Sequence, residues 1–126
     1  MTLKENLEAA AKRLDGALEA EMWAQRRLEA AKDGLLVAEM KGRAGGLPVN
    51  GEVVAYADMG RNEAERQAVF GLALRERHAN EVKEAQQAED FLRVAVAARK
   101  RAELAWQHAR YLVRLLEYAP REGWDE

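Results

Sequence analysis

Hydrophobic residues recur along this chain at the spacing of α-helices, in two long stretches separated by a break. In the first stretch, leucine and methionine return every three or four residues with charged residues between them, which is typical of a helix with one apolar face. The residues that carry this pattern are Leu3, Leu7, Leu14, Leu18, Met22, Leu28, Leu35 and Leu36. Thr2 and Glu5 form a capping box at its beginning. We therefore predict a first helix over residues 1–41.

The break is rich in residues that do not continue a helix. The stretch Lys41–Gly51, KGRAGGLPVNG, holds four glycines, one proline and one asparagine. For the following residues 52–60, EVVAYADMG, a short strand, a single helical turn and a mobile hairpin tip are all open. We predict a joint over residues 42–61 that is the most mobile and most protease-sensitive part of the chain.

A second helix is predicted to begin at Asn62. The side-chain oxygen of Asn62 can accept a hydrogen bond from a free amide of the new helix, and Glu65 can reach back to the cap. Gly60 supplies backbone freedom just before the cap. Helical periodicity then continues to Tyr118, and Pro120 ends it.

These segments predict one all-α domain, a long helical hairpin in which a Gly-rich loop joins two long helices. The second helix covers residues 62–118, and an acidic tail follows over residues 119–126. At 1.5 Å per residue, the second helix would be about 85 Å long, and the shorter first helix cannot cover all of it. We therefore expect the distal part of the second helix to have other helical partners.

A helical wheel of the second helix shows where these partners would pack. One apolar face is too wide for a single partner helix, which indicates a coiled-coil-like bundle formed by self-association. The residues that we predict to form this oligomer interface are Phe91, Ala95, Ala98, Ala102, Ala105, Trp106, Ala109, Leu112, Val113 and Leu116.

Residues that could carry chemistry are few. The chain has no cysteine, and its two histidines, His78 and His108, stand thirty residues apart, without the spacing of metal ligands. The joint lacks the Lys-Ser/Thr ending of a phosphate-binding loop. We expect no enzyme activity and assign no catalytic residue, metal ligand or cofactor. Without a signal peptide or a run of eighteen apolar residues, we expect a cytoplasmic protein with no membrane partner.

Charge is concentrated in one block of the second helix. The whole chain has a net charge of −2, whereas residues 93–114 sum to +5. A row of cations with an aromatic residue can follow phosphates and stack an unpaired base. The candidate nucleic-acid-binding residues are Arg93, Lys100, Arg110, Tyr111 and Arg114, which project opposite the apolar face with Glu103 as the only acid among them. The alternative is a solvated helix face without a ligand.

The residues around the second cap resemble a known group of proteins. Gly60, Arg61, Asn62, Arg66 and Ala68 form the pattern G-[KR]-N-x-x-x-R-x-A, which opens a second long helix in a group of small phage and prophage proteins. In layout, this group is similar to the UvsY-type recombination mediators, which are helical oligomers that bind single-stranded DNA and help load a recombinase. This chain differs in its longer joint and its weakly acidic net charge.

The resemblance implies a homo-oligomeric, non-enzymatic accessory protein of DNA recombination or repair in the cytoplasm of a phage host. Its partners would be single-stranded DNA and a recombinase. The alternative is a protein-binding module without nucleic-acid binding, such as an assembly factor, a scaffold or an inhibitor of a host defence complex. Salt-dependent DNA binding would favour the first reading over the second.

Overall fold

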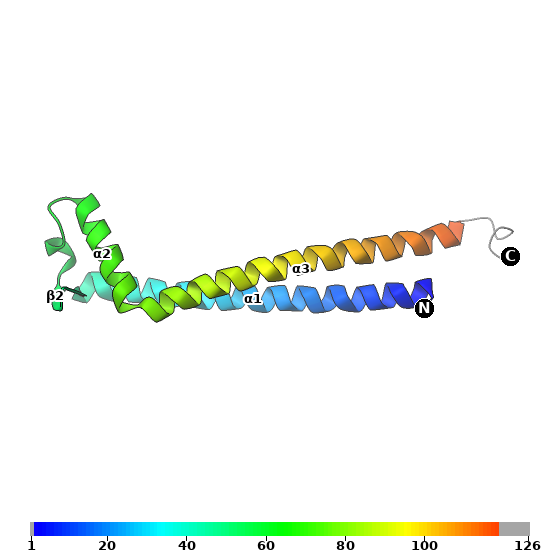
Figure 1. Ribbon diagram of the computed structural model, residues 1–126, viewed down its shortest axis with the longest axis horizontal. Coiled ribbons are helices and arrows are strands. Elements are labelled where there is room, and N and C mark those ends of the chain that lie inside the picture. Colours follow the sequence, from blue (N-terminus) through cyan, green and yellow to red (C-terminus); the bar gives the residue numbers. More distant parts are fainter. Residues whose placement is uncertain (1, 119–126) are drawn as a thin grey trace. The chain divides into compact units, whose positions relative to one another are not determined.

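The computed structural model describes residues 2–118, and the predicted tail over residues 119–126 lies outside the described residues. The described chain is mostly helical, which confirms the all-α class, with a small hairpin between its helices (Figure 1). In chain order, the elements are α1 (Leu3–Gly45), β1 (Leu47–Val49), β2 (Glu52–Val54), the 3₁₀ turn η1 (Tyr56–Asp58), α2 (Glu63–Arg77) and α3 (Ala79–Tyr118).

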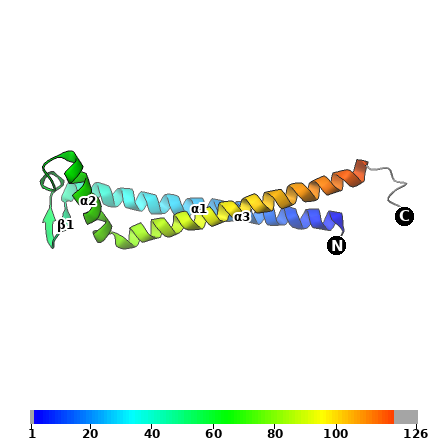
Figure 2. The same cartoon turned by 45° about the horizontal axis from the view of Figure 1, so that its top comes forward.

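The chain divides into two compact units. The first, here named the coil, contains the described residues of Met1–Gln25 and Phe91–Glu126. The second, here named the head, is Arg26–Asp90. In the coil, the first part of α1 and the last part of α3 lie side by side in opposite directions (Figures 1 and 2). Its first helix begins as predicted, with the Glu5 N–H donating to Thr2 Oγ1 over 3.1 Å.

The head contains the end of α1, which lies at Gly45 rather than at the predicted residue 41. The helix stops at the first residue with a left-handed backbone, Gly46, whose φ is +81°. The Gly46 N–H donates to the carbonyl of Gly42 over 2.8 Å, as in a glycine C-cap. A Cβ at Gly46 would lie only 2.7 Å from the carbonyl oxygen of Val54, so this position also lacks room for a side chain.

The predicted joint contains an antiparallel hairpin in which Leu47 pairs with Val54 and Val49 with Glu52. Its two-residue turn is Asn50-Gly51, with φ angles of 52° and 85°. Such turns match the twist of the strands, and Asn-Gly is their preferred sequence. In the head, the hairpin packs beside α2 (Figure 2). Of the open alternatives for residues 52–60, the strand and the helical turn both occur, one after the other.

The core of the head joins this hairpin to α2. Leu47 and Met59 from the predicted joint are buried together with Phe70 and Ala73 of α2. The ring of Tyr56 meets Phe70 edge-on, with ring centroids 5.5 Å apart. The joint is therefore a folded part of the head, and its greater mobility stays a prediction.

The single helix predicted over residues 62–118 is wrong, because the structure has two helices there. α2 ends at Arg77, and His78 leaves the helical conformation with φ −115° and ψ 40°. The backbone of His78 serves both helices: its N–H donates to Leu74, and its carbonyl accepts the N–H of Val82. With no glycine or proline at this point, periodicity alone could not reveal the break.

Candidate macromolecule-binding surface

The two helices of the coil meet along a seam of alternating three- and four-residue steps. This spacing is the signature of a coiled coil, and in the coil every residue at these steps is buried or half-buried. On α1 the seam residues are Leu3, Leu7, Ala10, Leu14, Ala17, Glu21 and Ala24. On α3 they are Leu92, Ala95, Arg99, Ala102, Trp106, Ala109, Val113 and Leu116. Alanine at every seventh position lets the helices approach closely, because the distance between helix axes follows side-chain size.

The seam changes the assignment of six residues predicted for an oligomer interface. Ala95, Ala102, Trp106, Ala109, Val113 and Leu116 lie on the seam, which buries or half-buries them within a single chain. Because the chain folds back on itself, α1 of the same chain provides a matching apolar stripe. A partner within the same chain has a high effective concentration, which favours this contact over one between chains. The wide apolar face predicted from the helical wheel is therefore two neighbouring stripes, of which one is the seam.

The second stripe of α3, here named the outer stripe, takes six of the eight positions that directly precede a seam residue; the other two are Arg101 and His108. It consists of Phe91, Val94, Ala98, Ala105, Leu112 and Leu115. Ala98 and Leu112 are half-buried, and the other four are exposed, with Val94 at 65 % of its full exposure. Leu104, at 66 % exposure, lies near the same side of the helix. Four residues of the predicted interface, Phe91, Ala98, Ala105 and Leu112, thus lie outside the seam.

A surface groove of about 380 Å³ lies between α1 and α3 beside the outer stripe. Its polar lining residues are Asn6 and Arg13 from α1 and His108 from α3, and none of the described lining residues is acidic. Its remaining lining residues are Leu3, Ala9, Ala10, Ala105, Ala109 and Leu112. The groove therefore offers a small-residue surface with a basic edge.

One charged cluster interrupts the apolar seam. Arg99 Nε donates to Glu21 Oε2 of α1 over 2.9 Å, and Arg99 NH1 donates to Glu103 Oε2 of its own helix, also over 2.9 Å. The side chains of Glu21 and Arg99 keep only 14 % and 26 % of their full exposure. The hydrogen bond to Glu21, and then the one to Glu103, raises the pKa of Arg99 above its ordinary value.

The candidate nucleic-acid-binding residues all lie exposed on α3. Arg93, Lys100, Arg110, Tyr111 and Arg114 are outside the seam. The guanidinium of Arg110 lies 5.2 Å from the centre of the Trp106 ring, a cation–π contact that holds this cation beside the seam. The predicted acid of this face, Glu103, is engaged by Arg99. The residues of this cationic face are exposed, and the binding of a ligand to them stays a prediction.

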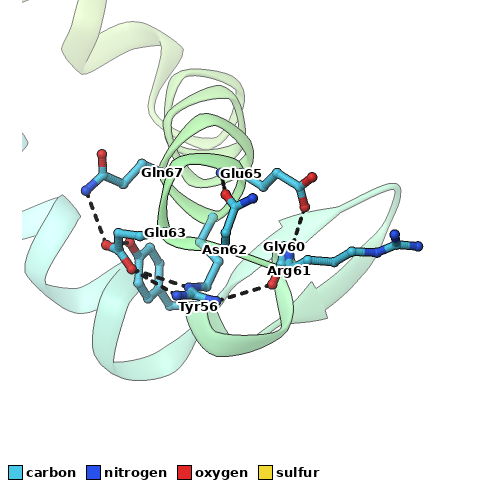
Figure 3. Close-up of polar contacts among 8 residues, drawn as sticks. Tyr56, Gly60, Arg61, Asn62, Glu63, Glu65 and Gln67 are labelled. Carbon is cyan, nitrogen blue, oxygen red and sulfur yellow. Dashed lines mark hydrogen bonds and ion pairs between the residues drawn. The ribbon is translucent and has the colours of Figure 1, made fainter.

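The motif at the start of α2 has a local structural role (Figure 3). Asn62 Oδ1 accepts the N–H of Glu65 over 2.9 Å, which confirms the predicted N-cap, and Glu65 Oε2 accepts the N–H of Arg61. A Cβ at Gly60 would lie 2.5 Å from that of Glu65. Gly60 is therefore needed for close approach to the helix, whereas the sequence had suggested backbone freedom. Arg66 NH1 donates to the Gly60 carbonyl over 3.4 Å and completes the turn.

Glu63 connects this turn to the head core (Figure 3). Its carboxylate accepts hydrogen bonds from the Tyr56 hydroxyl over 2.6 Å and from Arg66 and Gln67 over 3.2 Å each. These donors, Tyr56 first, hold the pKa of Glu63 below its ordinary value, and the same bond raises the pKa of Tyr56. The guanidinium of Arg43 covers the Tyr56 ring at 4.8 Å.

The two histidines lie in different surroundings. His78 forms the junction between α2 and α3, with Nδ1 3.6 Å from Glu81 Oε1, and His108 lines the groove of the coil. Within residues 2–118, no group of three or more His, Cys, Asp or Glu side chains is arranged to hold a metal ion. No helix in this part of the chain has the length and apolar character needed to cross a membrane.

The sequence interpretation missed the Glu21–Arg99 pair and the groove residues Arg13 and His108. A signal for the Glu21–Arg99 pair is present in the sequence, because alanine recurs every seven residues from Ala10 and again from Ala88. Following that repeat, rather than the leucines alone, places Glu21 and Arg99 on the two seams.

Comparisons with protein-family models, curated proteins and solved structures found no match to this chain. The fold and its surfaces therefore carry the functional argument.

Proposed function

We propose that this protein is a non-enzymatic binding module that self-associates through the outer stripe of its coil. One observation carries the proposal: beside its seam, α3 has a second stripe of six apolar residues, four of them exposed, which only Arg101 and His108 interrupt. A helix with two adjacent apolar stripes packs against two neighbours, and α1 provides only one of them. Large apolar side chains exposed along one side of a helix are typical of an interaction site.

Charge supports a second copy of the chain as the neighbour. Residues 93–114, which carry most of the outer stripe, have a net charge of +5. The rest of the chain has seven more acids than bases. A second copy therefore offers acidic surface to this basic block, and complementary charge favours correctly oriented association.

Replacing Val94 and Leu115 by serine tests this proposal. Both residues are exposed, so the substitutions should leave the single chain helical while they weaken the association. Light scattering after size exclusion should show a larger particle for the wild type and a smaller one for Val94→Ser/Leu115→Ser. The matched control Gln86→Ser/Gln107→Ser changes exposed residues of α3 outside the stripe and should keep the wild-type size. Equal sizes for wild type and stripe variant would contradict the proposal.

A second candidate function is single-stranded nucleic-acid binding along the cationic face. It is supported by the exposure of Arg93, Lys100, Arg110, Tyr111 and Arg114 on one helix. Several subunits would present several copies of this face, so that weak contacts add through multivalency. In the recombination role suggested by the resemblance, such an assembly would present the strand to a recombinase.

Oligonucleotide anisotropy at several salt concentrations distinguishes this function from protein binding alone. Phosphate contacts should make the affinity of the wild type fall steeply with salt. Changing Arg93, Lys100, Arg110 and Arg114 together to glutamine should remove most of the binding. The matched control changes four exposed cations elsewhere, Lys12, Lys32, Arg75 and Lys83, to glutamine. Its net charge equals that of the first variant. Equal loss in both variants would mean non-specific attraction, and no binding by the wild type would leave the protein-binding function alone.

A further inference from the structure

The seam of the coil contains an ambiguity that its alanines and leucines cannot resolve. Its pattern repeats every seven residues on both helices. A slip of α3 along α1 by seven residues, about 10.5 Å, would again bring alanines and larger apolar residues onto the seam. Apolar contacts therefore favour several alignments that differ by whole heptads.

On the seam of the coil, two residues break this equivalence; in the head, Arg27 of α1 and Glu84 of α3 form a further ion pair over 2.8 Å. Among the seam residues of the coil described above, Glu21 is the only charged residue of α1 and Arg99 the only charged residue of α3. In the observed alignment they meet at 2.9 Å and are both more than half-buried. In a slipped alignment, each would lie about 10.5 Å away from its partner along the seam.

We propose that the Glu21–Arg99 pair is a register lock, which selects one alignment of α1 and α3. A largely buried charge that loses its partner is strongly unfavourable, so a slipped alignment is penalised at Glu21, and Arg99 loses its hydrogen bond across the seam. Polar residues inside an apolar seam have this use in coiled coils, where they specify register at some cost in stability. Glu103 belongs to the same helix as Arg99 and would move with it, so its bond to Arg99 does not distinguish the alignments.

The lock also determines which residues form the groove. Asn6, Ala9 and Arg13 face the groove from α1, while Ala105, His108 and Leu112 face it from α3. A slip of one heptad would bring different residues of α3 beside this part of α1. Glu21 and Arg99 are thus positioning residues for the composite surface, although neither lines the groove.

The alignment can be measured with two spin labels, because the chain contains no cysteine that would compete for labelling. Asn6→Cys and Ala105→Cys place one label on each helix at the groove. Labelled protein is diluted with unlabelled protein so that pulsed electron resonance reports distances within one chain. With the natural Glu21 and Arg99, we expect one narrow distance distribution.

Neutral seam variants should lose this single alignment. In Glu21→Leu/Arg99→Leu, we expect helical content to remain while the distance distribution acquires a second population or broadens. Glu21→Gln/Arg99→Gln provides a second neutral pair if the leucine variant fails to fold. The control Glu8→Leu/Lys83→Leu makes the same kind of change at exposed positions and should keep the narrow distribution.

Exchanging the two charges tests whether the alignment depends on the ion pair itself or only on which side chains occupy positions 21 and 99. In a Glu103→Gln background, which avoids repulsion beside residue 99, Glu21→Arg/Arg99→Glu should restore the single narrow distance. A narrow wild-type distance in both neutral variants would overturn the lock. The proposal would also be overturned if Glu103→Gln alone kept the narrow distance distribution and the charge exchange in that background did not restore it.

Discussion

The head and the coil bury different kinds of residue. Among its described residues, the head buries Leu47, Met59 and Phe70 in one cluster. In the described part of the coil, the buried hydrophobic residues are all alanines: Ala10, Ala24, Ala95 and Ala109. The larger apolar residues of the coil are half-buried or exposed, and Val94 and Leu104 are among the exposed ones.

This difference separates a part that completes its own core from a part that does not. The head closes a small core with a hairpin and a helix, and its exposed apolar residues, such as Val53 and Leu72, do not continue a seam. The coil holds its helices together by close approach, and four of the six residues of its outer stripe are exposed. This contrast is the reason why we propose that the coil, and not the head, is the binding region.

The largest expected effect comes from removing volume in the head. Phe70→Ala deletes the ring that packs on Tyr56 and should lower the free energy of unfolding of the head by about 3–5 kcal/mol. Leu72→Ala, at an exposed position of the same helix, should change it by less than about 0.5 kcal/mol. Region-resolved amide hydrogen exchange would show the loss of protection in α2. Similar losses for both variants would contradict the assigned core.

The coil should be destabilised by the opposite change, a larger side chain at a buried alanine. Ala95→Leu inserts three heavy atoms into the close seam and should destabilise the coil by about 1–3 kcal/mol. Ala97→Leu adds the same atoms at an exposed position and should be nearly neutral. Urea denaturation of both variants checks the difference. A neutral Ala95→Leu would mean that the helices are not held close by their alanines.

A backbone substitution tests how the head ends α1. Gly46→Ala forces a side chain into a left-handed conformation beside the Val54 carbonyl and should cost about 1–2 kcal/mol. The neighbouring Gly45→Ala has no atom within 4 Å of its new Cβ and should be neutral or slightly stabilising. Thermal unfolding of the two variants gives the comparison. Equal melting temperatures would show that the turn can rearrange.

The smallest expected effect is a pH dependence at Glu63. Because its pKa is lowered in the folded head, its stabilising contribution is present above the ordinary glutamate pKa of 4.5 and disappears as the pH falls through the folded value. Tyr56→Phe removes the first of its hydrogen-bond donors and should raise the Glu63 pKa toward that ordinary value. Carboxyl chemical shifts followed through an acid titration measure it. An unchanged Glu63 pKa in Tyr56→Phe would contradict the described contact.

The sequence predicted those features that depend on local signals. The helical periodicity, the caps at Thr2 and Asn62 and the end of α1 near its glycines all follow from residues within a few positions of one another. The sequence analysis leaves a strand, a helical turn and a hairpin tip as alternatives for residues 52–60, although Asn50-Gly51 is a strong signal for a hairpin turn. The break at His78 has no such signal, because its backbone bonds serve both helices.

The candidate surface could be predicted only in part, because its interpretation depends on which stripe α1 covers. A helical wheel shows that Ala95 and Phe91 share a broad face, but it cannot show that one is buried and the other exposed. That division is a tertiary effect of the chain folding back on itself. The cationic residues Arg93, Lys100 and Arg114 lie away from the seam, as the wheel predicted, and their ligand stays a hypothesis.

Sedimentation equilibrium of three proteins tests the central claim, that the coil rather than the head is the associating region. The wild type should have a mass above that of a monomer at micromolar concentration. Val94→Ser/Leu115→Ser in the coil should shift the mass toward the monomer, and Val53→Ser/Leu72→Ser in the head should leave it unchanged. A monomeric wild type, or dissociation by the head variant alone, would contradict this account.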